Sequence, residues 1–527
     1  QTSYYFPKHV DKPNWRPIVF KPPYLIFLTL VSLGLAGIQE SLFRRSNAKG
    51  GLMQFLGLND ISVPEYFLWR YFPTIVTVTY GVAYQLVDVE AKRLEPYYRL
   101  AERSGSTFAQ SLNVDSTNFW TWFRPPFPGS ARTRLSTAIS LVAVIAVPVI
   151  QNATLEVRAA NDGFALFVHP IWSRVLSGSL IFAAVAGLLL LWPLHQSSGL
   201  SSDPCGISGL LAMTTRGHIL SDFIGLSPLS SDEEINKSKL NYRKYFLYNS
   251  SLSPIEQLHW SPKLRVPSDR KEHSFTLPLV QSVPAFIFIL SLLALVPVLI
   301  FTRANIILSR APFLMTAIGV AVKLLWTLFD TNIRLTEPYY QLVRRHAKPS
   351  VLSVDYTGTM PFYLPIKALR NHDGTLALVA TISILLEVLT VCLSSFGSAG
   401  ANFMHRKGTS TATDLLEGDA QTFRSFWISL VLSISIIISL LVTAVYVYVQ
   451  RSDVSLPRKP GTLAFVLLAT HQAKMIVNWV GCEKLSYEQR RNLLVSWDKT
   501  YGFGWYQGRD GALHLGIDEE PLVTDYR

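Results

Sequence analysis

The sequence of 527 residues has little charge. Asp, Glu, Lys and Arg make up only 16% of it, whereas 49% is hydrophobic. Because an ordinary soluble domain carries about 25% charged residues, this composition is typical of a membrane protein. The formal net charge is +12, but Lys and Arg lie between long apolar blocks. We therefore expect attraction to anionic lipid headgroups and no nucleic-acid partner.

Cysteine is scarce as well. Cys205, Cys392 and Cys482 lie far apart and lack metal-ligand spacing, which argues against a disulfide framework or a zinc site. The sequence also has no HExxH, GxSxG, kinase or NTPase signature. We therefore predict no cofactor, no metal and no enzymatic activity, although an intramembrane enzyme needs none of these motifs.

One stretch occurs twice, as DVEAKRLEPYYRL over 88–100 and DTNIRLTEPYYQL over 330–342. Each copy has an Asp followed seven residues later by Glu-Pro-Tyr-Tyr, each follows an apolar run with Gly-Val-Ala, and each precedes a Val-Asp loop. The repeated residues are Asp88, Glu95, Pro96, Tyr97 and Tyr98, and then Asp330, Glu337, Pro338, Tyr339 and Tyr340. This pattern predicts a tandem duplication of a membrane unit, with the units at 1–272 and 273–527.

Eight apolar stretches are long enough to cross a bilayer, which needs roughly 20 helical residues. They are residues 18–38, 71–87, 135–151, 173–194, 277–301, 311–329, 375–396 and 426–449. The predicted fold is an all-α membrane protein with two four-helix transmembrane repeats. Because each repeat has an even number of spans, the two repeats are predicted to be parallel.

The loops after the second, fourth and sixth stretches are the richest in Lys and Arg. The positive-inside rule therefore predicts that these loops and both termini are cytoplasmic, in the plasma membrane or an endomembrane. On this topology Asn152-Ala153-Thr154 is a candidate N-glycosylation site on the outside. The sequons at Asn236 and Asn249 should stay unmodified.

A proline-led segment containing Leu-Leu-Ala follows the fourth and the eighth stretch, at Pro204 and Pro460. We expect both segments to lie against the inner membrane face or against the bundle. A ninth span over 460–480 is the main alternative, which polar residues within the run disfavour. A capping box at Ser231 and another at Ser486 predict a charged cytoplasmic helix after each segment. The glycine- and aromatic-rich tail is predicted to form a short ordered loop.

The duplicated Glu-Pro-Tyr-Tyr, the Leu-Leu-Ala segments and a tail with Asp510-Gly511 and Gly516-Ile517-Asp518-Glu519-Glu520 resemble a family of fungal multi-pass membrane proteins. That family carries a tandemly duplicated domain of unknown function. The resemblance covers nearly the whole chain and implies a fungal integral membrane protein. It implies no activity, no substrate and no catalytic residue.

The repeated motif has two interpretations. Proline disfavours a helical conformation in the residue before it, so the chain is predicted to bend at each Glu and to restart as a helix at the tyrosine pair. Tyrosines there suit the headgroup layer. We favour a structural elbow. The alternative is a lipid headgroup site that uses the arginines near each motif, namely Arg99, Arg103, Arg344 and Arg345.

Lys323 and Glu387 are the only charged residues well inside predicted spans. A lysine at bilayer depth costs roughly 2.5–3.5 kcal/mol on insertion scales, so such charges usually pair or line a cavity. We predict that the two residues pair between the sixth and seventh spans. A locked helix contact is the favoured interpretation, and transport or gating is the alternative.

The tail offers two weaker patterns. Glycines from Gly502 to Gly508 do not match the spacing of a dinucleotide or phosphate loop. His514 with Asp510 and Asp518 is a weak metal candidate, and a solvated turn is favoured. For the whole chain, a non-enzymatic membrane scaffold or growth-related protein is the preferred function. A transporter or channel with a path between the repeats is second, and a lipid-modifying enzyme is third.

Overall fold

The structure is a computed structural model that describes most of the chain. The described residues are 13–55, 62–115, 130–160, 163–192, 196–255, 279–302, 307–308, 311, 313–396, 420–451 and 456–526. The predicted boundary between the two units, at 272–273, lies outside them.

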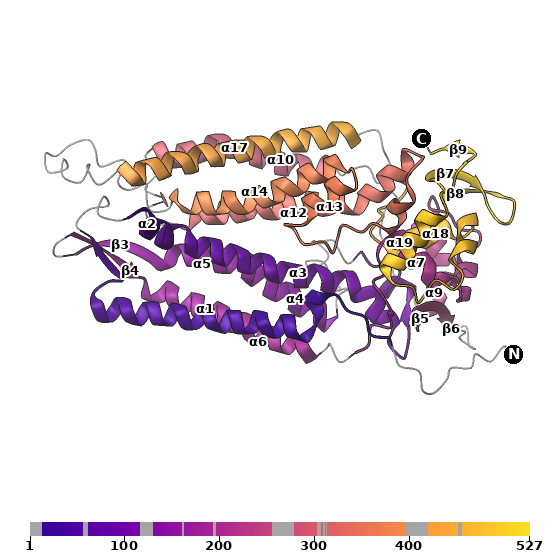
Figure 1. The fold of residues 1–527 in the computed structure, drawn as a ribbon, viewed down its shortest axis with the longest axis horizontal. Coiled ribbons are helices and arrows are strands. Elements are labelled where there is room, and N and C mark those ends of the chain that lie inside the picture. Colours follow the sequence, from indigo (N-terminus) through magenta and orange to yellow (C-terminus); the bar gives the residue numbers. More distant parts are fainter. Residues whose placement is uncertain are drawn as a thin grey trace.

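A helix occupies each of the eight predicted stretches, and the two groups of four run side by side along the long axis (Figure 1). The first group consists of α1 (Pro22–Lys49), α3 (Phe72–Leu100), α4 (Ala131–Leu141) continued by the π-helical turn η5 (Val142–Ala146) and α5 (Val147–Thr154), and α6 (Pro170–Leu191). The second group consists of α10 (Leu279–Phe301), α12 (Leu314–Val343), α14 (Gly374–Ser394) and α17 (Ala420–Arg451). A short helix, α2 (Val63–Arg70), precedes α3.

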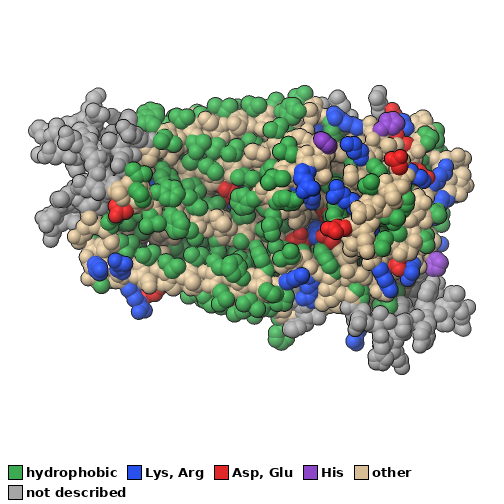
Figure 2. All heavy atoms as spheres, viewed as in Figure 1, with side chains coloured by type: hydrophobic (Ala, Val, Ile, Leu, Met, Phe, Trp, Pro, Cys, Tyr) green, Lys and Arg blue, Asp and Glu red, His purple; other side chains and the backbone are tan. Residues whose placement is uncertain are grey.

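Among the described residues, six helices are long and apolar enough to cross a membrane. They are Pro22–Lys49, Ala131–Thr154, Pro170–Leu191, Leu314–Val343, Gly374–Ser394 and Ser425–Arg451. Large apolar side chains such as Leu30, Ile181 and Val445 are exposed on their outer faces, and apolar side chains cover the helical part of the molecule in Figure 2, whereas charged ones gather at its ends. These features indicate a membrane protein. The eight-span layout itself stays a prediction, because α3 and α10 are not among the six.

The Gly-Val-Ala runs have a packing role. In each repeat the glycine lies where the second helix crosses the third. A Cβ atom on Gly81 would lie 2.9 Å from the carbonyl oxygen of Ala143, and one on Gly319 would lie 3.2 Å from the Cα atom of Thr390. Glycine therefore permits the close approach of these helix pairs.

The segments that follow the second, fourth, sixth and eighth helices gather at one end of the bundle, and we call this part the end domain (Figure 1). Its helices are α7 (Gly206–Thr214), η7 (His218–Phe223), α8 (Asp232–Lys237), α9 (Lys239–Tyr242), η8 (Pro349–Ser353), α13 (Leu364–Arg370), α18 (Leu463–Thr470), η10 (Lys474–Trp479) and α19 (Tyr487–Ser496). The N-terminal Trp15 donates its backbone N–H to the Leu200 carbonyl. The described chain thus begins and ends at this end, where both repeated motifs also lie.

The chain is mostly helical, but the all-α prediction is wrong in detail because three small antiparallel sheets occur. In the end domain, β2 (Ser106–Thr107), β5 (Lys244–Tyr248) and β6 (Ser251–Ile255) form one sheet, and β8 (Leu513–Glu519), β7 (Tyr501–Gln507) and β9 (Thr524–Asp525) form another. At the opposite end, β4 (Gly163–Val168) lies between β1 (Met53–Phe55) and β3 (Leu155–Ala160). The tail is therefore ordered, as predicted, but as strands rather than as a loop.

The Leu-Leu-Ala segments do not lie on the membrane face. They form α7 and α18, whose residues are buried from Ile207 to Thr214 and from Ala464 to Thr470 in one apolar core built from both repeats. With eight residues, α18 is also far shorter than the roughly 20 residues that a ninth span needs. Both predicted capping boxes are present, at the starts of α8 and α19.

Candidate functional site at the junction of the repeats

The repeated motifs meet where the two bundles join the end domain, and we call this region the repeat junction. The predicted break at each Glu is wrong, because α3 runs through Pro96 to Leu100 and α12 runs through Pro338 to Val343. A proline inside a helix removes one backbone hydrogen bond. The following turn is nevertheless held helical, because its tyrosines are packed in the protein interior.

In the first repeat, both acids of the motif fasten α3 to α4. Asp88 contacts Lys92 Nζ at 2.6 Å and accepts a hydrogen bond from Ser136 Oγ at 3.0 Å. Glu95 accepts hydrogen bonds from the backbone nitrogen and the hydroxyl of Ser130, at 3.0 and 2.8 Å. Ser130 is the N-cap residue directly before α4, so Glu95 fixes the start of that helix.

In the second repeat, the corresponding acids also connect helices, but through different partner residues. Asp330 pairs with Arg334 on its own helix and accepts a hydrogen bond from Ser383 Oγ of α14 at 3.2 Å. Glu337 is paired with Arg451 at the end of α17, and both side chains are about 95% buried, with 5% and 4% exposed. The motif therefore connects the helices of each repeat.

The tyrosines are buried in the protein and do not face lipid headgroups. Tyr97, Tyr98, Tyr339 and Tyr340 are all buried, with at most 7% of each residue exposed. The guanidinium of Arg132 lies 3.6 Å above the Tyr98 ring centre, and Tyr340 donates its hydroxyl to the Gln450 carbonyl at 2.8 Å. These rings hold the junction together.

The four arginines proposed as lipid contacts divide into two pairs. Arg99 donates to Glu95 at 2.8 Å and to the Gln110 carbonyl at 2.7 Å, and Arg345 lies 2.5 Å from an Asp525 carboxylate oxygen in the tail. Both therefore serve contacts within the protein. Arg103 and Arg344 are exposed, and the Arg344 guanidinium also lies 4.6 Å from the Tyr340 ring centre, so Arg103 is the better candidate for a headgroup.

The two repeats are assembled crosswise in the end domain, which the sequence did not reveal. A Cβ atom on Gly206 of α7 would lie 2.6 Å from the Leu352 carbonyl oxygen of the other repeat. In the reverse direction, Ala464 of α18 donates its backbone N–H to the Leu112 carbonyl. Each Leu-Leu-Ala helix thus packs against the Val-Asp loop of the other repeat.

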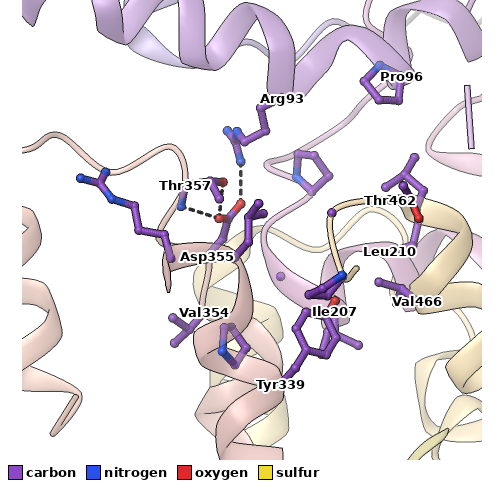
Figure 3. Close-up of a pocket in the computed structure, with 18 of the residues that line it drawn as sticks. Arg93, Pro96, Ile207, Leu210, Tyr339, Val354, Asp355, Thr357, Thr462 and Val466 are labelled. Carbon is purple, nitrogen blue, oxygen red and sulfur yellow. Dashed lines mark hydrogen bonds and ion pairs between the residues drawn. The ribbon is translucent and has the colours of Figure 1, made fainter. Parts of the chain in front are cut away.

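The charges at these crossings differ between the two copies. Asp115 of the first Val-Asp loop contacts Lys459 Nζ at 2.7 Å, and Lys459 directly precedes Pro460. At the equivalent place before Pro204 stands Asp203, which would repel Asp355 of the second loop. Arg93 lies between these acids, 3.0 Å from Asp203 and 3.3 Å from Asp355, and Figure 3 shows its contact with Asp355.

Burial alters the titration of this cluster. It raises the pKa of Glu90, which also pairs with Arg93, to about 7. Burial also acts to raise the pKa of Asp355, but Arg93 and the hydrogen bonds from Thr357 outweigh it and hold the pKa below its ordinary value. The sequence analysis did not identify the roles of Arg93, Glu90, Asp203 and Lys459. One pattern could have indicated them, namely the charged residue directly before Pro204 and before Pro460.

A cavity of about 150 Å³ opens at the junction and is lined by residues of both repeats. Four equivalent pairs are among them, namely Pro96 and Pro338, Tyr97 and Tyr339, Val114 and Val354, and Pro204 and Pro460, and the apolar side chains of Ile207, Leu210, Leu463 and Val466 come from the two Leu-Leu-Ala helices. Arg93, Arg334, Asp355, Thr357 and Thr462 add polar groups to the wall (Figure 3). Burial raises the pKa of Tyr97, so its hydroxyl stays neutral.

The intramembrane pair is present as predicted. Lys323 Nζ lies 2.6 Å from a Glu387 carboxylate oxygen, between α12 and α14. One helical turn closer to the end domain, Ser383 connects Trp326 Nε1 at 3.0 Å with Asp330 at 3.2 Å. Arg334 lines the cavity and pairs with Asp330, which in turn contacts Ser383. Polar side chains therefore extend from the cavity wall to Ser383, which lies four residues, or about 6 Å along the helix, from Glu387.

Exchange of the two charges tests whether this contact matters. Lys323→Glu alone and Glu387→Lys alone each place two like charges together at bilayer depth, which should lower the melting temperature in detergent and the yield of folded protein. The double variant Lys323→Glu with Glu387→Lys is expected to recover most of the loss. If the double variant is no more stable than the single ones, the pair does not stabilise the fold.

The remaining predicted sites serve structural contacts. His514 pairs with Asp510 at 2.9 Å, whereas Asp518 is buried and accepts the backbone N–H groups of Lys474 and Met475, each at 3.0 Å. These three residues therefore do not form a single metal site. Asn152 Nδ2, the atom that a glycan would modify, donates to Thr316 of the other repeat at 2.9 Å. That contact argues against glycosylation.

All three cysteines are buried as free thiols. Burial raises the pKa of Cys205, with a further contribution from the nearby Asp355 carboxylate, and burial likewise raises the pKa of Cys482. Since the thiolate is the reactive form, we expect little maleimide labelling of the native protein at pH 8 and complete labelling after unfolding. Intact-mass measurement checks this. Rapid native labelling of Cys205 would show that the end domain opens.

Comparison with known proteins agrees with the duplication. Residues 67–154 and 311–398 each match the family model described as "Protein of unknown function (DUF3433)". Each match contains the second and third helices of a repeat, with the Glu-Pro-Tyr-Tyr motif near the end of the second helix. No curated protein and no solved structure matches the chain. The chain thus carries two tandem copies of a segment similar to this domain of unknown function.

Proposed function

We propose that this membrane protein is a non-enzymatic scaffold, with the bundle as its anchor and the end domain as the surface that other proteins bind. The observation that carries the proposal is how the repeated motifs are used. Their acids and tyrosines are buried in contacts between helices, and the Val-Asp loops hold the two repeats together crosswise. The most distinctive residues thus build a fixed platform.

Exposed apolar side chains on the end domain support a binding surface. Val477 in η10 and Val480 directly after it are 60% and 65% exposed. Contiguous apolar side chains that are exposed away from the membrane-facing helices mark surfaces that bind proteins. The same end domain contains Ile224 and Leu229, which are also exposed.

Proximity labelling from a ligase fused after Arg527 tests the scaffold in cells. We expect a reproducible set of neighbours whose enrichment falls several-fold in Val477→Glu with Val480→Glu. The control Glu488→Gln, on the exposed side of α19, should leave the set unchanged. If the neighbours equal those of an unrelated multi-pass protein in the same membrane, the scaffold proposal is wrong.

Transport between the repeats is the second candidate, and one observation favours it. The polar side chains between the cavity and the Lys323–Glu387 pair follow the helices into the bundle. Intramembrane ionisable residues commonly mark ion or proton pathways. Proton and cation flux into proteoliposomes decides between the two. A flux that exceeds that of empty liposomes and is abolished by Glu387→Gln would establish transport instead of a purely structural role.

A further inference from the structure

We infer that α13 and the residues before it lie in the bilayer interface and anchor the second repeat to the membrane surface. Five large apolar residues over residues 360–369 are about half exposed, and we call them the α13 face. They are Met360 (48%), Phe362 (54%), Tyr363 (46%), Ile366 (54%) and Leu369 (62%). Few soluble surfaces present so many adjacent apolar side chains without a partner.

The opposite side of α13 is firmly attached to the protein. Leu364 and Ala368 are fully buried in the apolar core of the second repeat. Lys367 Nζ donates to the Asp355 carbonyl at 2.8 Å and to the Thr359 hydroxyl at 2.9 Å. Because these contacts fix the helix, the α13 face stays outward.

The position of α13 identifies the bilayer as the occupant of this face. Figure 1 places α13 where the bundle joins the end domain, and α14, one of the six apolar helices, begins four residues after α13 ends. The α13 face therefore continues the lipid-facing surface of the bundle.

The composition of the segment fits the same location. Residues 360–372 contain no acid, and the exposed Arg370 at the end of α13 complements anionic headgroups. Phe362 and Tyr363 add aromatic rings, which are enriched at the level where hydrocarbon meets water. A helix with one apolar face and basic flanks lies in the membrane plane rather than across it.

This location has a consequence for the repeat junction. Lys367 connects α13 to Asp355, whose side chain lines the cavity. The membrane surface thus lies beside the junction, with the rest of the end domain outside the hydrocarbon.

Environment-sensitive labels test the inference on the full chain in proteoliposomes. Cysteine is introduced singly as Phe362→Cys and Ile366→Cys and labelled with the NBD fluorophore. The matched controls are Leu229→Cys and Val523→Cys, apolar positions of the end domain that are 51% and 59% exposed. The native cysteines are buried, and the unsubstituted protein measures their background. Substitution of exposed side chains should preserve folding, which size-exclusion chromatography checks.

Nitroxide lipids report where each label lies. We expect blue-shifted NBD emission at positions 362 and 366, and quenching by a shallow acyl-chain nitroxide that is several-fold stronger than at the two controls. Emission and quenching equal to the controls would overturn the inference. A blue shift that occurs without lipid quenching and increases with protein density would also overturn the inference. The α13 face would then be covered by a second copy of the chain.

Discussion

Arg451→Ala is expected to lower the free energy of unfolding by about 3–5 kcal/mol, because it leaves the Glu337 carboxylate buried without its partner. The pair connects the end of α17 to the repeated motif of α12, and only 4% and 5% of its two side chains are exposed. Thermal melting of the purified protein in detergent measures the loss. Reduced recovery of monodisperse protein should accompany it.

Two further variants separate the buried charge from other effects. Removing both partners in Arg451→Ala with Glu337→Ala should be less damaging than Arg451→Ala alone, since no unpaired charge then remains. Arg458→Ala breaks the ion pair with Asp232, whose two side chains are less buried at 20% and 23% exposed, and should cost less than Arg451→Ala. An Arg451→Ala protein as stable as Arg458→Ala would contradict the proposed role of the buried pair.

Gly516→Ala is expected to have the second large effect. Gly516 in β8 lies directly against α18, and an added Cβ atom would lie 1.9 Å from the Ala469 carbonyl oxygen. Overpacking of this kind typically costs about 1–3 kcal/mol, and here a backbone atom rather than a flexible side chain must move. We expect a lower melting temperature and faster proteolysis of the C-terminal strands.

The control for this change is Gly178→Ala in α6, where no atom lies within 4 Å of the added methyl group. It should leave stability unchanged or slightly raise it, because alanine favours a helix more than glycine does. If the Gly516→Ala and Gly178→Ala proteins have the same melting temperature and the same rate of proteolysis, then β8 does not pack on α18 as described.

The sequence predicted the features that depend on local patterns. Helices occupy all eight predicted stretches because their apolar length is visible in the chain itself. The capping box at Ser486 and its counterpart at Ser231 were found because serine and its partner stand three residues apart. The Lys323–Glu387 contact was predicted because a lone charge in a span needs a partner.

The features that depend on tertiary contacts were not predicted. Pro96 and Pro338 do not break their helices, because packing of the next turn outweighs the local preference. The glycine-rich tail was predicted to form a loop, yet Gly504 lies within β7. A Cβ atom there would lie 2.7 Å from the Thr524 carbonyl oxygen. The role of Arg93 also depends on Asp203 and Asp355, which are remote in sequence.

The crosswise assembly makes the two halves of the chain non-interchangeable. If two first halves dimerised, Asp115 of one would face Asp203 of the other, and Arg93, which now lies between Asp203 and Asp355, would have to replace the cation that Lys459 provides. Two second halves would instead bring Lys459 toward Asp355. The two crossings of the duplicated chain therefore depend on different cations, so replacing one half by a copy of the other would change the ion pair at a crossing.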